Sequence, residues 1–562
     1  MTIKLKSILL MITTLTCFIS TGQNLEELGK EKPLKFSGSV NASLNSYHTT
    51  RTAPSRDPFF WTLSGSPVLS LYGVTMPFSF VVSQKQQSFR QPFNQFGVSP
   101  YYKWLHMHLG YRSMNFSRYS LNGHTFTGVG ADADPGNFRL GFMVGRLLKP
   151  IPEDILADYP IQPTYKRMGY SFKVGYGKPS NYVDVVLFNG WDVDESISRP
   201  LDSALVNPQA NLVLGVKSKQ MLFKKLLFDF DFGISGWTSN LYAEGLPRTD
   251  FPLAGVVGKL LDVNYSTQLL KAGNASLSYR FGKVNLQAKY ERVDPDYKSM
   301  GAYYFNTDLE NYTISPSWSM LNNKMRIMAS MGLQRNNLLE NKASQNKRRI
   351  NSIRLNYNIS QKFNLSTSYT NFQMNQLRYD IVRRDVIDSL GIVQFSQNFM
   401  VNINYNFGGD NHKYSLGLNN SIQAFTQDRR NDIIDNDSRS FSPNISFRYS
   451  NKEKKLGISS NLNFNEYKAA TINSFNWGYS LSANKRPEKG LFNYNVSMGF
   501  YQTYLNGEKG GDTWRVGAGG NMSFKERHSL GLRLNFVNRK SYNGRVEGFS
   551  EVLGSVSYGY NF

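Results

Sequence analysis

The chain has 562 residues, of which 14% are aromatic and one is a cysteine, and its formal net charge is +23. No stretch after the N-terminus holds the roughly 18 consecutive apolar residues that a membrane-spanning helix needs, which excludes a helical membrane protein. The charge would suit anionic glycans, lipid phosphates or nucleic acid. Lysines and arginines are, however, spread singly over connections and strand faces, so we expect no nucleic-acid partner.

The N-terminus is predicted to be a targeting segment. A basic start, an apolar run over 8–19 and small residues after it have the layout of a secretory signal peptide, which we place at residues 1–23. Cys17 lies inside it and is either removed or, in the alternative, lipidated as the first mature residue. With ordinary cleavage the mature chain uses neither disulfides nor thiolate chemistry. Residues 24–33 then form a short periplasmic segment.

The dominant pattern from Leu34 to Phe562 has a period of two. In residues 228–235, for example, aromatic and aliphatic residues alternate with Asp, Gly and Ser. Such segments run for about 9–13 residues, which is the length of a tilted membrane strand. Their polar face is rich in Arg, Lys, Asn and Ser, and aromatics lie near many strand ends. The pattern predicts an all-β, antiparallel transmembrane β-barrel of the outer membrane over 34–562, with about 24 strands (between roughly 18 and roughly 26).

Short turns alternate with long polar loops along the chain. Taking Phe562 as a periplasmic end, every short turn falls on the periplasmic side, as such barrels require. Because side chains on a strand point alternately to lipid and to the lumen, the pattern also predicts charged side chains in the lumen, some of them paired across it. The predicted lumen charges are Lys173, Asp184, Lys217, Asp229, Asp231, Arg280, Arg326, Arg354 and Arg533.

One connection does not fit this alternation. Counting connections back from Phe562 places Ser117–Gly136 in the periplasm, although it is far longer than the other turns there. Long loops in compact folds are usually functional or disordered. We interpret it as a loop folded into the lumen as a constriction; the alternatives are a flexible turn and a miscounted strand. The constriction candidates are His106, His108, Arg112, His124, Phe126, Asp132, Asp134 and Arg139.

The N-terminal third also carries a family resemblance. The runs 91–97, 109–112, 123–124 and 135–139 resemble an uncharacterised family of large outer-membrane barrels of the Bacteroidota. The resemblance implies a barrel and its location, and no settled activity.

The sequence contains no recognisable motif for catalysis or metal binding. His106 and His108 lie on one face of a strand and could bind a metal or simply form hydrogen bonds; no third ligand is identifiable, so no metal site is predicted. The acidic stretches 192–195 and 432–437 could bind calcium or be solvated. No nucleophile elbow, catalytic triad or nucleotide-binding loop appears, so we expect no enzyme and no cofactor.

The sequence therefore predicts a channel or transporter for small polar or anionic solutes, without a TonB-type plug because the segment before the first strand is short. The alternative is a scaffold subunit of a secretion or protein-assembly complex. Expected partners are outer-membrane lipid and lipopolysaccharide, the outer-membrane insertion machinery, and other outer-membrane proteins or lipoproteins. The predicted insertion signal is the terminal alternation of Val556, Tyr558, Tyr560 and Phe562.

Overall fold

The computed structural model describes residues 34–562, apart from 55, 85–94, 154–161, 199–205, 247–259, 380–390, 430–436, 488–491, 543 and 545. The predicted signal peptide (1–23) and periplasmic segment (24–33) lie outside the described residues. In the part that the structure describes, no helix is long and apolar enough to cross a membrane.

Antiparallel strands make up almost all of the regular structure, with one short 3₁₀ turn, η1 (Asp194–Ser196), in the described chain. The strands are β1 (Leu34–Ser37), β2 (Ser39–Thr49), β3 (Phe59–Gly65), β4 (Val68–Leu71), β5 (Val74–Ser83), β6 (Gln95–Val98), β7 (Tyr101–Tyr102), β8 (Leu105–Asn115), β9 (Asn122–Ala133), β10 (Phe138–Leu148), β11 (Lys166–Lys178), β12 (Asn181–Val193), β13 (Ala210–Leu222), β14 (Leu226–Thr238) and β15 (Thr267–Phe281). They continue as β16 (Val284–Val293), β17 (Leu309–Met320), β18 (Met325–Arg335), β19 (Ser344–Asn358), β20 (Phe363–Arg378), β21 (Ile392–Gly408), β22 (His412–Arg429), β23 (Ser438–Asn451), β24 (Leu456–Ala469), β25 (Asn473–Lys485), β26 (Phe492–Leu505), β27 (Glu508–Phe524), β28 (His528–Ser541) and β29 (Phe549–Asn561).

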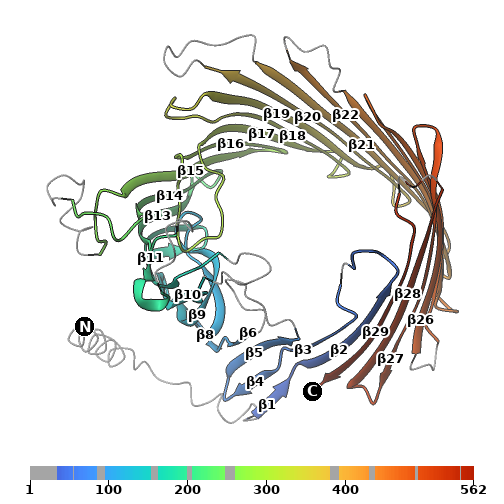
Figure 1. Cartoon of the computed structure of the whole chain (residues 1–562), viewed down its shortest axis with the longest axis horizontal. Coiled ribbons are helices and arrows are strands. Elements are labelled where there is room, and N and C mark those ends of the chain that lie inside the picture. Colours follow the sequence, from blue (N-terminus) through green and yellow to red (C-terminus); the bar gives the residue numbers. More distant parts are fainter. Residues whose placement is uncertain are drawn as a thin grey trace.

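These strands close into a barrel (Figure 1). From β8 onwards each strand pairs with its neighbours in sequence, and β29 returns to β2, with Ser39 opposite Asn561. The segments β1 and β2, β3 and β4, and β6 and β7 are parts of three interrupted strands. The described residues thus form a closed antiparallel barrel of 26 strands, against the roughly 24 expected from an even-numbered pattern. Because the number is even, the first and last strands are antiparallel, so β2 begins beside the end of β29.

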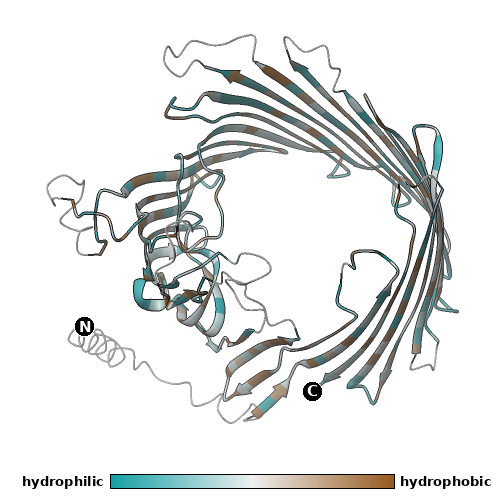
Figure 2. Ribbon diagram, viewed as in Figure 1, coloured by the Kyte–Doolittle hydropathy of each residue, from teal (hydrophilic) through white to brown (hydrophobic). Residues whose placement is uncertain are grey.

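The outer surface of the barrel is apolar. Val174, Tyr176 and Val185 point outward and are 59%, 60% and 53% exposed, while their sequence neighbours face the lumen. Figure 2 shows the resulting alternation of apolar and polar bands along the strands. Aromatic rings gather where strands meet short turns: the ring centroids of Phe407 and Tyr414 are 5.2 Å apart, and those of Tyr414 and Tyr449 are 5.1 Å apart. An apolar band flanked by aromatic rings is the surface that a lipid bilayer requires.

The prediction that Ser117–Gly136 is one loop folded into the lumen is wrong for most of the segment, although its first residues do lie inside the barrel. Most of it is strand β9, which pairs with β8 and β10, so that Asp132 lies opposite both His106 and Gly141. The alternative of a miscounted strand is the one that the structure contains. The segment therefore divides into a turn at 116–121, at the long-loop end of the barrel, then the strand, then a turn at 134–137 at the short-turn end.

A packed layer lies inside one side of the barrel. The turn 116–121 and residues 297–302 of the β16–β17 connection, together called the inner layer, fold onto the inward faces of β8–β16. Asn122 N–H donates to the carbonyl of Gly301 at 2.8 Å, and Ser299 Oγ donates to the carbonyl of Ser120 at 2.6 Å. The resulting apolar core contains Met114, Phe116, Leu121, Phe126, Met143, Leu147, Val186, Phe188, Val213, Trp237 and Met300.

Candidate functional site

The lumen wall has two parts with different surfaces. The covered wall is the inward face of β8–β16, on which the inner layer lies. The open wall is the inward face of β18–β28. Candidate functional side chains occur on both, so each wall is described in turn.

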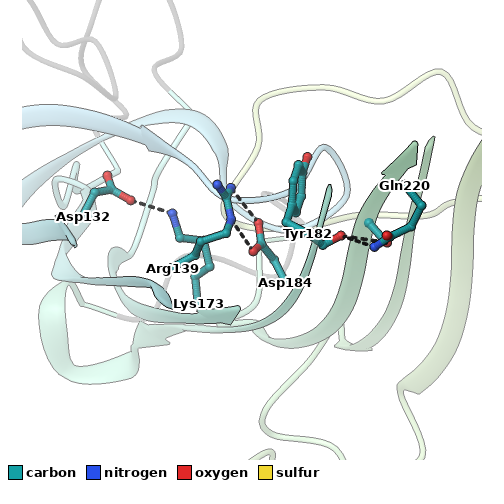
Figure 3. A network of polar contacts seen from close by, with 7 residues as sticks. Asp132, Arg139, Lys173, Tyr182, Asp184 and Gln220 are labelled. Carbon is teal, nitrogen blue, oxygen red and sulfur yellow. Dashed lines mark hydrogen bonds and ion pairs between the residues drawn. The ribbon is translucent and has the colours of Figure 1, made fainter. Parts of the chain in front are cut away.

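Charged groups on the covered wall are paired along the wall (Figure 3). Arg139 on β10 donates two hydrogen bonds to Asp184 on β12, from Nε at 2.7 Å and from Nη2 at 3.0 Å. Its guanidinium also stacks over the ring of Tyr182, 4.1 Å from the centroid. Lys173 on β11 reaches Asp132 on β9 at 2.8 Å. The expectation of pairing across the lumen is therefore wrong for Lys173 and Asp184, because each partner lies two strands away on the same wall.

Glycine on the intervening strand makes each of these pairs possible. Gly175 lies between Arg139 and Asp184, and a Cβ atom there would come within 2.0 Å of Asp184 Oδ1. Gly141 lies between Asp132 and Lys173, where a Cβ atom would come within 3.0 Å of Lys173 Cε. A strand with no side chain at this position lets its two neighbours interact across it.

A second carboxylate cluster holds the inner layer to the wall. Asp231 on β14 accepts hydrogen bonds from Ser117 Oγ at 2.5 Å and from the backbone N–H of Arg118 at 2.9 Å. The Arg118 side chain pairs with Glu291 on β16 at 2.8 Å. Hydrogen bonds to an ionised acceptor are stronger than neutral ones. Asp231 and Glu291 therefore anchor the turn 116–121 over β14–β16.

Tyr119 is fully buried at the centre of this contact. Its hydroxyl donates to Glu291 Oε1 at 3.4 Å and accepts from Asn274 Nδ2 at 3.1 Å. Burial raises the pKa of Tyr119 to about 12, although the bond from Asn274 opposes the rise. Tyr297 donates from its hydroxyl to the Tyr119 carbonyl at 2.6 Å, and burial raises the pKa of Tyr297 as well. Both phenols are therefore neutral at physiological pH.

The other constriction candidates are dispersed. His108 lies 3.6 Å from Asp132, and His106 stacks on Tyr101 at 5.4 Å. Arg112 donates to Ser79 Oγ at 2.6 Å. His124 is buried and stacks on Tyr303 at 4.3 Å, and its Nδ1 lies 2.9 Å from the carbonyl of Thr125. Phe126 belongs to the apolar core, and Asp134 lies in the turn 134–137. Except for Asp134, these candidates belong to the strands of the wall and form no loop across the lumen.

No metal centre is evident in the described part of the chain, where no group of three His, Cys, Asp or Glu side chains converges. Asp192 accepts two hydrogen bonds from Arg167, at 2.8 and 3.0 Å, while Asp194 and Glu195 form η1. Of the second acidic stretch, residues 432–436 lie outside the described residues.

The open wall is lined by short polar side chains. Neighbouring strands place an asparagine or serine at the same level, as where Asn402, Asn419, Asn444 and Asn463 follow one another across β21–β24. Asn419 Nδ2 donates to Asn444 Oδ1 at 3.3 Å. Such side chains offer both hydrogen-bond donors and acceptors to the lumen.

Five arginines on the open wall have no acidic partner among the described residues. Arg326, Arg354, Arg448, Arg515 and Arg533 face inward and are exposed. Over the described residues of β18–β28 the inward face carries no Asp or Glu apart from Glu508, which the register shift at Thr503/Tyr504 places opposite Leu505 at the long-loop end of β27. None of the five arginines forms an ion pair with a described residue. Arg448 and Arg515 were not among the predicted lumen charges, although the same alternation marks them: each stands between two outward aromatic or aliphatic residues.

The remaining predicted residues occupy the walls and the closing strand. Lys217 and Asp229 are half-buried on the covered wall, and Arg280 is exposed near the short-turn end of β15. Val556 and Tyr558 face outward on β29, 42% and 40% exposed, and the ring of Phe562 lies 4.5 Å from that of Phe36. The role of Val556, Tyr558, Tyr560 and Phe562 as an insertion signal stays a prediction.

Comparison with known proteins finds no matching family model and no similar curated sequence. Among solved structures, the chain is similar to the P pilus usher (PapC) translocation pore, with 10% identity, a TM-score of 0.36 and coverage of 94% of this chain and 99% of that one. It is similar to the FrpB iron transporter of Neisseria meningitidis, with 12% identity, a TM-score of 0.41 and coverage of 96% and 82%. It is also similar to OccK10 (OpdN) of Pseudomonas aeruginosa, with 11% identity, a TM-score of 0.28 and coverage of 76% and 98%. Likenesses this weak carry no inference about solute or partner.

Proposed function

We propose that this barrel is an outer-membrane channel that passes small polar solutes, with a preference for anions, along its open wall. The location is supported by the apolar outer surface, the aromatic rings near the short turns and the closure of the sheet, because a bilayer tolerates no unpaired strand edge. In this orientation the short turns face the periplasm and the long loops face the outside.

The observation that carries the proposal is the set of exposed arginines on the open wall that form no ion pair with any described residue. Arg326, Arg354, Arg448, Arg515 and Arg533 stand on a wall rich in Asn, Ser and Gly, and none of them has an acidic partner among the residues that the structure describes. A lumen bounded by a low-dielectric wall focuses the field of such charges and concentrates anions. Barrels with more than about 16 strands leave an aqueous channel.

Planar-bilayer recording tests both parts of the proposal. The purified barrel should conduct, and under a salt gradient its reversal potential should have the sign of anion selectivity. R515Q/R533Q should lower that selectivity, whereas neutralising the outward Lys468, which pairs with Glu466 at 2.6 Å, should not. A cation-selective pore would contradict the anion preference. A barrel that folds but does not conduct would contradict the channel and favour the scaffold hypothesis.

A further inference from the structure

A groove of about 310 Å³ lies on the outer surface at the long-loop end of β17–β20. We call it the outer cationic groove. Its lining residues are Glu310, Tyr312, Leu333, Gln334, Arg335, Lys347, Arg348, Arg349, Gln373 and Asn375. Arg335 shares its face of β18 with Leu333, which is 57% exposed, and Lys347 and Arg349 share theirs of β19 with Ile353, which is 51% exposed. The groove therefore faces the membrane side of the wall and not the lumen.

The height of the groove coincides with the edge of the apolar band. Leu333 and Ile353 lie among lipid-facing residues, and Arg335 and Lys347 come further toward the long loops. Arginine and lysine are costly in the hydrocarbon layer and stable at the level of lipid headgroups. The positive side chains thus mark the headgroup level of the outward leaflet.

The groove carries more positive charge than its carboxylate balances. Glu310 is already bound by Arg335 Nε at 2.5 Å and by the hydroxyl of Tyr290 at 2.9 Å. Arg335 stands directly opposite Lys347 in the ladder, and like charges so placed repel each other. Within the described residues Lys347 and Arg349 form no ion pair, and both are exposed. An anion bound between them would relieve the repulsion.

A neighbouring furrow on the same surface is suited to a lipid chain. Its lining includes Phe230 and Phe232 on β14 and Gly273 and Ala275 on β15, with Arg292 at its long-loop end. Because Gly273 and Ala275 have small side chains or none, they leave a depression in the surface between the larger apolar side chains. Apolar chains can therefore lie along the wall beside the cationic groove, which suits an amphiphile better than a free ion.

We propose that the outer cationic groove binds the phosphate of a phosphorylated glycolipid, lipid A, in the outer leaflet. Arg335 and Arg349 would hold phosphate oxygens by paired N–H donors, Lys347 would supply a point charge, and Gln373 would offer an amide to the sugar. This proposal rests on the outer-membrane location proposed above, because only there do the long loops face such a leaflet.

Native mass spectrometry of the full-length barrel tests the site. The probes are diphosphoryl lipid A, the same lipid A with its phosphates removed, and inorganic phosphate as a competitor. K347Q/R349Q should weaken the binding of diphosphoryl lipid A about tenfold or more, because it removes two charge-assisted contacts. The variant should bind the phosphate-free lipid as the unmodified barrel does. A gel mobility that changes on heating verifies that the unmodified barrel and the K347Q/R349Q variant are both folded.

R439Q/K468Q is the matched control. Arg439 and Lys468 also stand opposite each other on an outward face near the long loops, but Glu466 neutralises Lys468 at 2.6 Å. The control should retain lipid A binding. Equal loss in both variants, no loss in K347Q/R349Q, or displacement of lipid A by inorganic phosphate would each overturn the assignment. Conductance in lipid A-free bilayers separates the two proposals: a conducting barrel that ignores lipid A contradicts only this inference, and a silent barrel that binds it contradicts only the channel.

Discussion

The covered wall and the open wall belong to one barrel and have the same alternation of apolar and polar residues, yet their polar side chains are in opposite environments. On the covered wall Arg139, Lys173 and Asp231 are each bound to a partner and shielded by neighbouring side chains and the inner layer. On the open wall Arg515 and Arg533 face the lumen with no acidic partner in the described part of the chain. The comparison teaches that the inward face of a barrel becomes protein interior wherever a loop folds onto it, and stays a solvated surface elsewhere.

The physical reason lies in the cost of removing charge from water. A buried charge must be paired and hydrogen-bonded, or its burial costs several kcal/mol. A solvated arginine carries no such cost and keeps its field available to a solute. The covered wall is thus suited to stability and the open wall to transport.

The largest expected difference between the walls concerns the apolar core. Phe188→Ala empties a fully buried site on the covered wall and should lower the free energy of unfolding by about 3–5 kcal/mol. Phe372→Ala on the inward face of β20 removes a half-buried ring and should cost less than about 1.5 kcal/mol. Urea unfolding in lipid vesicles measures both. Equal losses would mean that the inner layer adds no core.

The next effect concerns the anchor of the inner layer. Asp231→Asn removes the ionised acceptor for Ser117 and for the N–H of Arg118, and should cost about 2–4 kcal/mol. It should also change single-channel conductance, because the turn 116–121 is then held less tightly against the wall. Asp229→Asn, two residues away on the same inward face, is the matched control and should change neither quantity. Unchanged conductance in Asp231→Asn would show that the turn stays in place without this anchor.

A smaller effect concerns the glycine between Arg139 and Asp184. Gly175→Ala puts a methyl group 2.0 Å from Asp184 Oδ1, so the pair must separate, at a cost of about 2 kcal/mol. Gly332→Ala, on the inward face of β18, meets its nearest atom at 3.5 Å and should stay within about 0.5 kcal/mol of the unmodified barrel. If the two variants unfold alike, the Arg139–Asp184 pair contributes nothing to stability.

The smallest effect is a dependence on alkaline pH. The pKa of Tyr119 is about 12 in the fold and about 10 in the unfolded chain, so its contribution is fully present below about pH 10 and is lost as the pH rises toward 12. We expect a fall in unfolding free energy of about 1–2 kcal/mol across that window, measured as the urea midpoint at each pH. Tyr119→Phe should reduce the fall, and Tyr501→Phe on the open wall should not. A fall of unchanged size in Tyr119→Phe would assign it to other groups.

Alternation was enough to predict the barrel, its lipid face and most of its strands, because a membrane strand must repeat apolar and polar residues. It failed at β9. There Gly128 and Gly130 replace inward side chains, since Gly145 and Met114 pack against them, and Thr125 and Thr127 weaken the outward apolar signal. An alternation that leaves out β9 places the turn 116–121 at the wrong end of the barrel.

The candidate site was predictable only as a list of inward charges. Which charges meet depends on register and on glycines in intervening strands, and neither can be read from one strand alone. The pairing of Arg139 with Asp184 is an example, because it requires Gly175 on a third strand. The role of residues 297–302 was also hidden, since a loop that folds inward has the same polar composition as one that faces solvent.

The two ion pairs that each reach across an intervening strand constrain the alignment of the sheet. Arg139 and Asp184 meet only when β10, β11 and β12 are all in register, and Asp132 and Lys173 make the same demand of β9, β10 and β11. A slip of one residue would turn a charged group toward lipid and leave its partner buried and unpaired. These pairs therefore penalise any arrangement in which β9–β12 are out of register, and so favour the native alignment of the sheet.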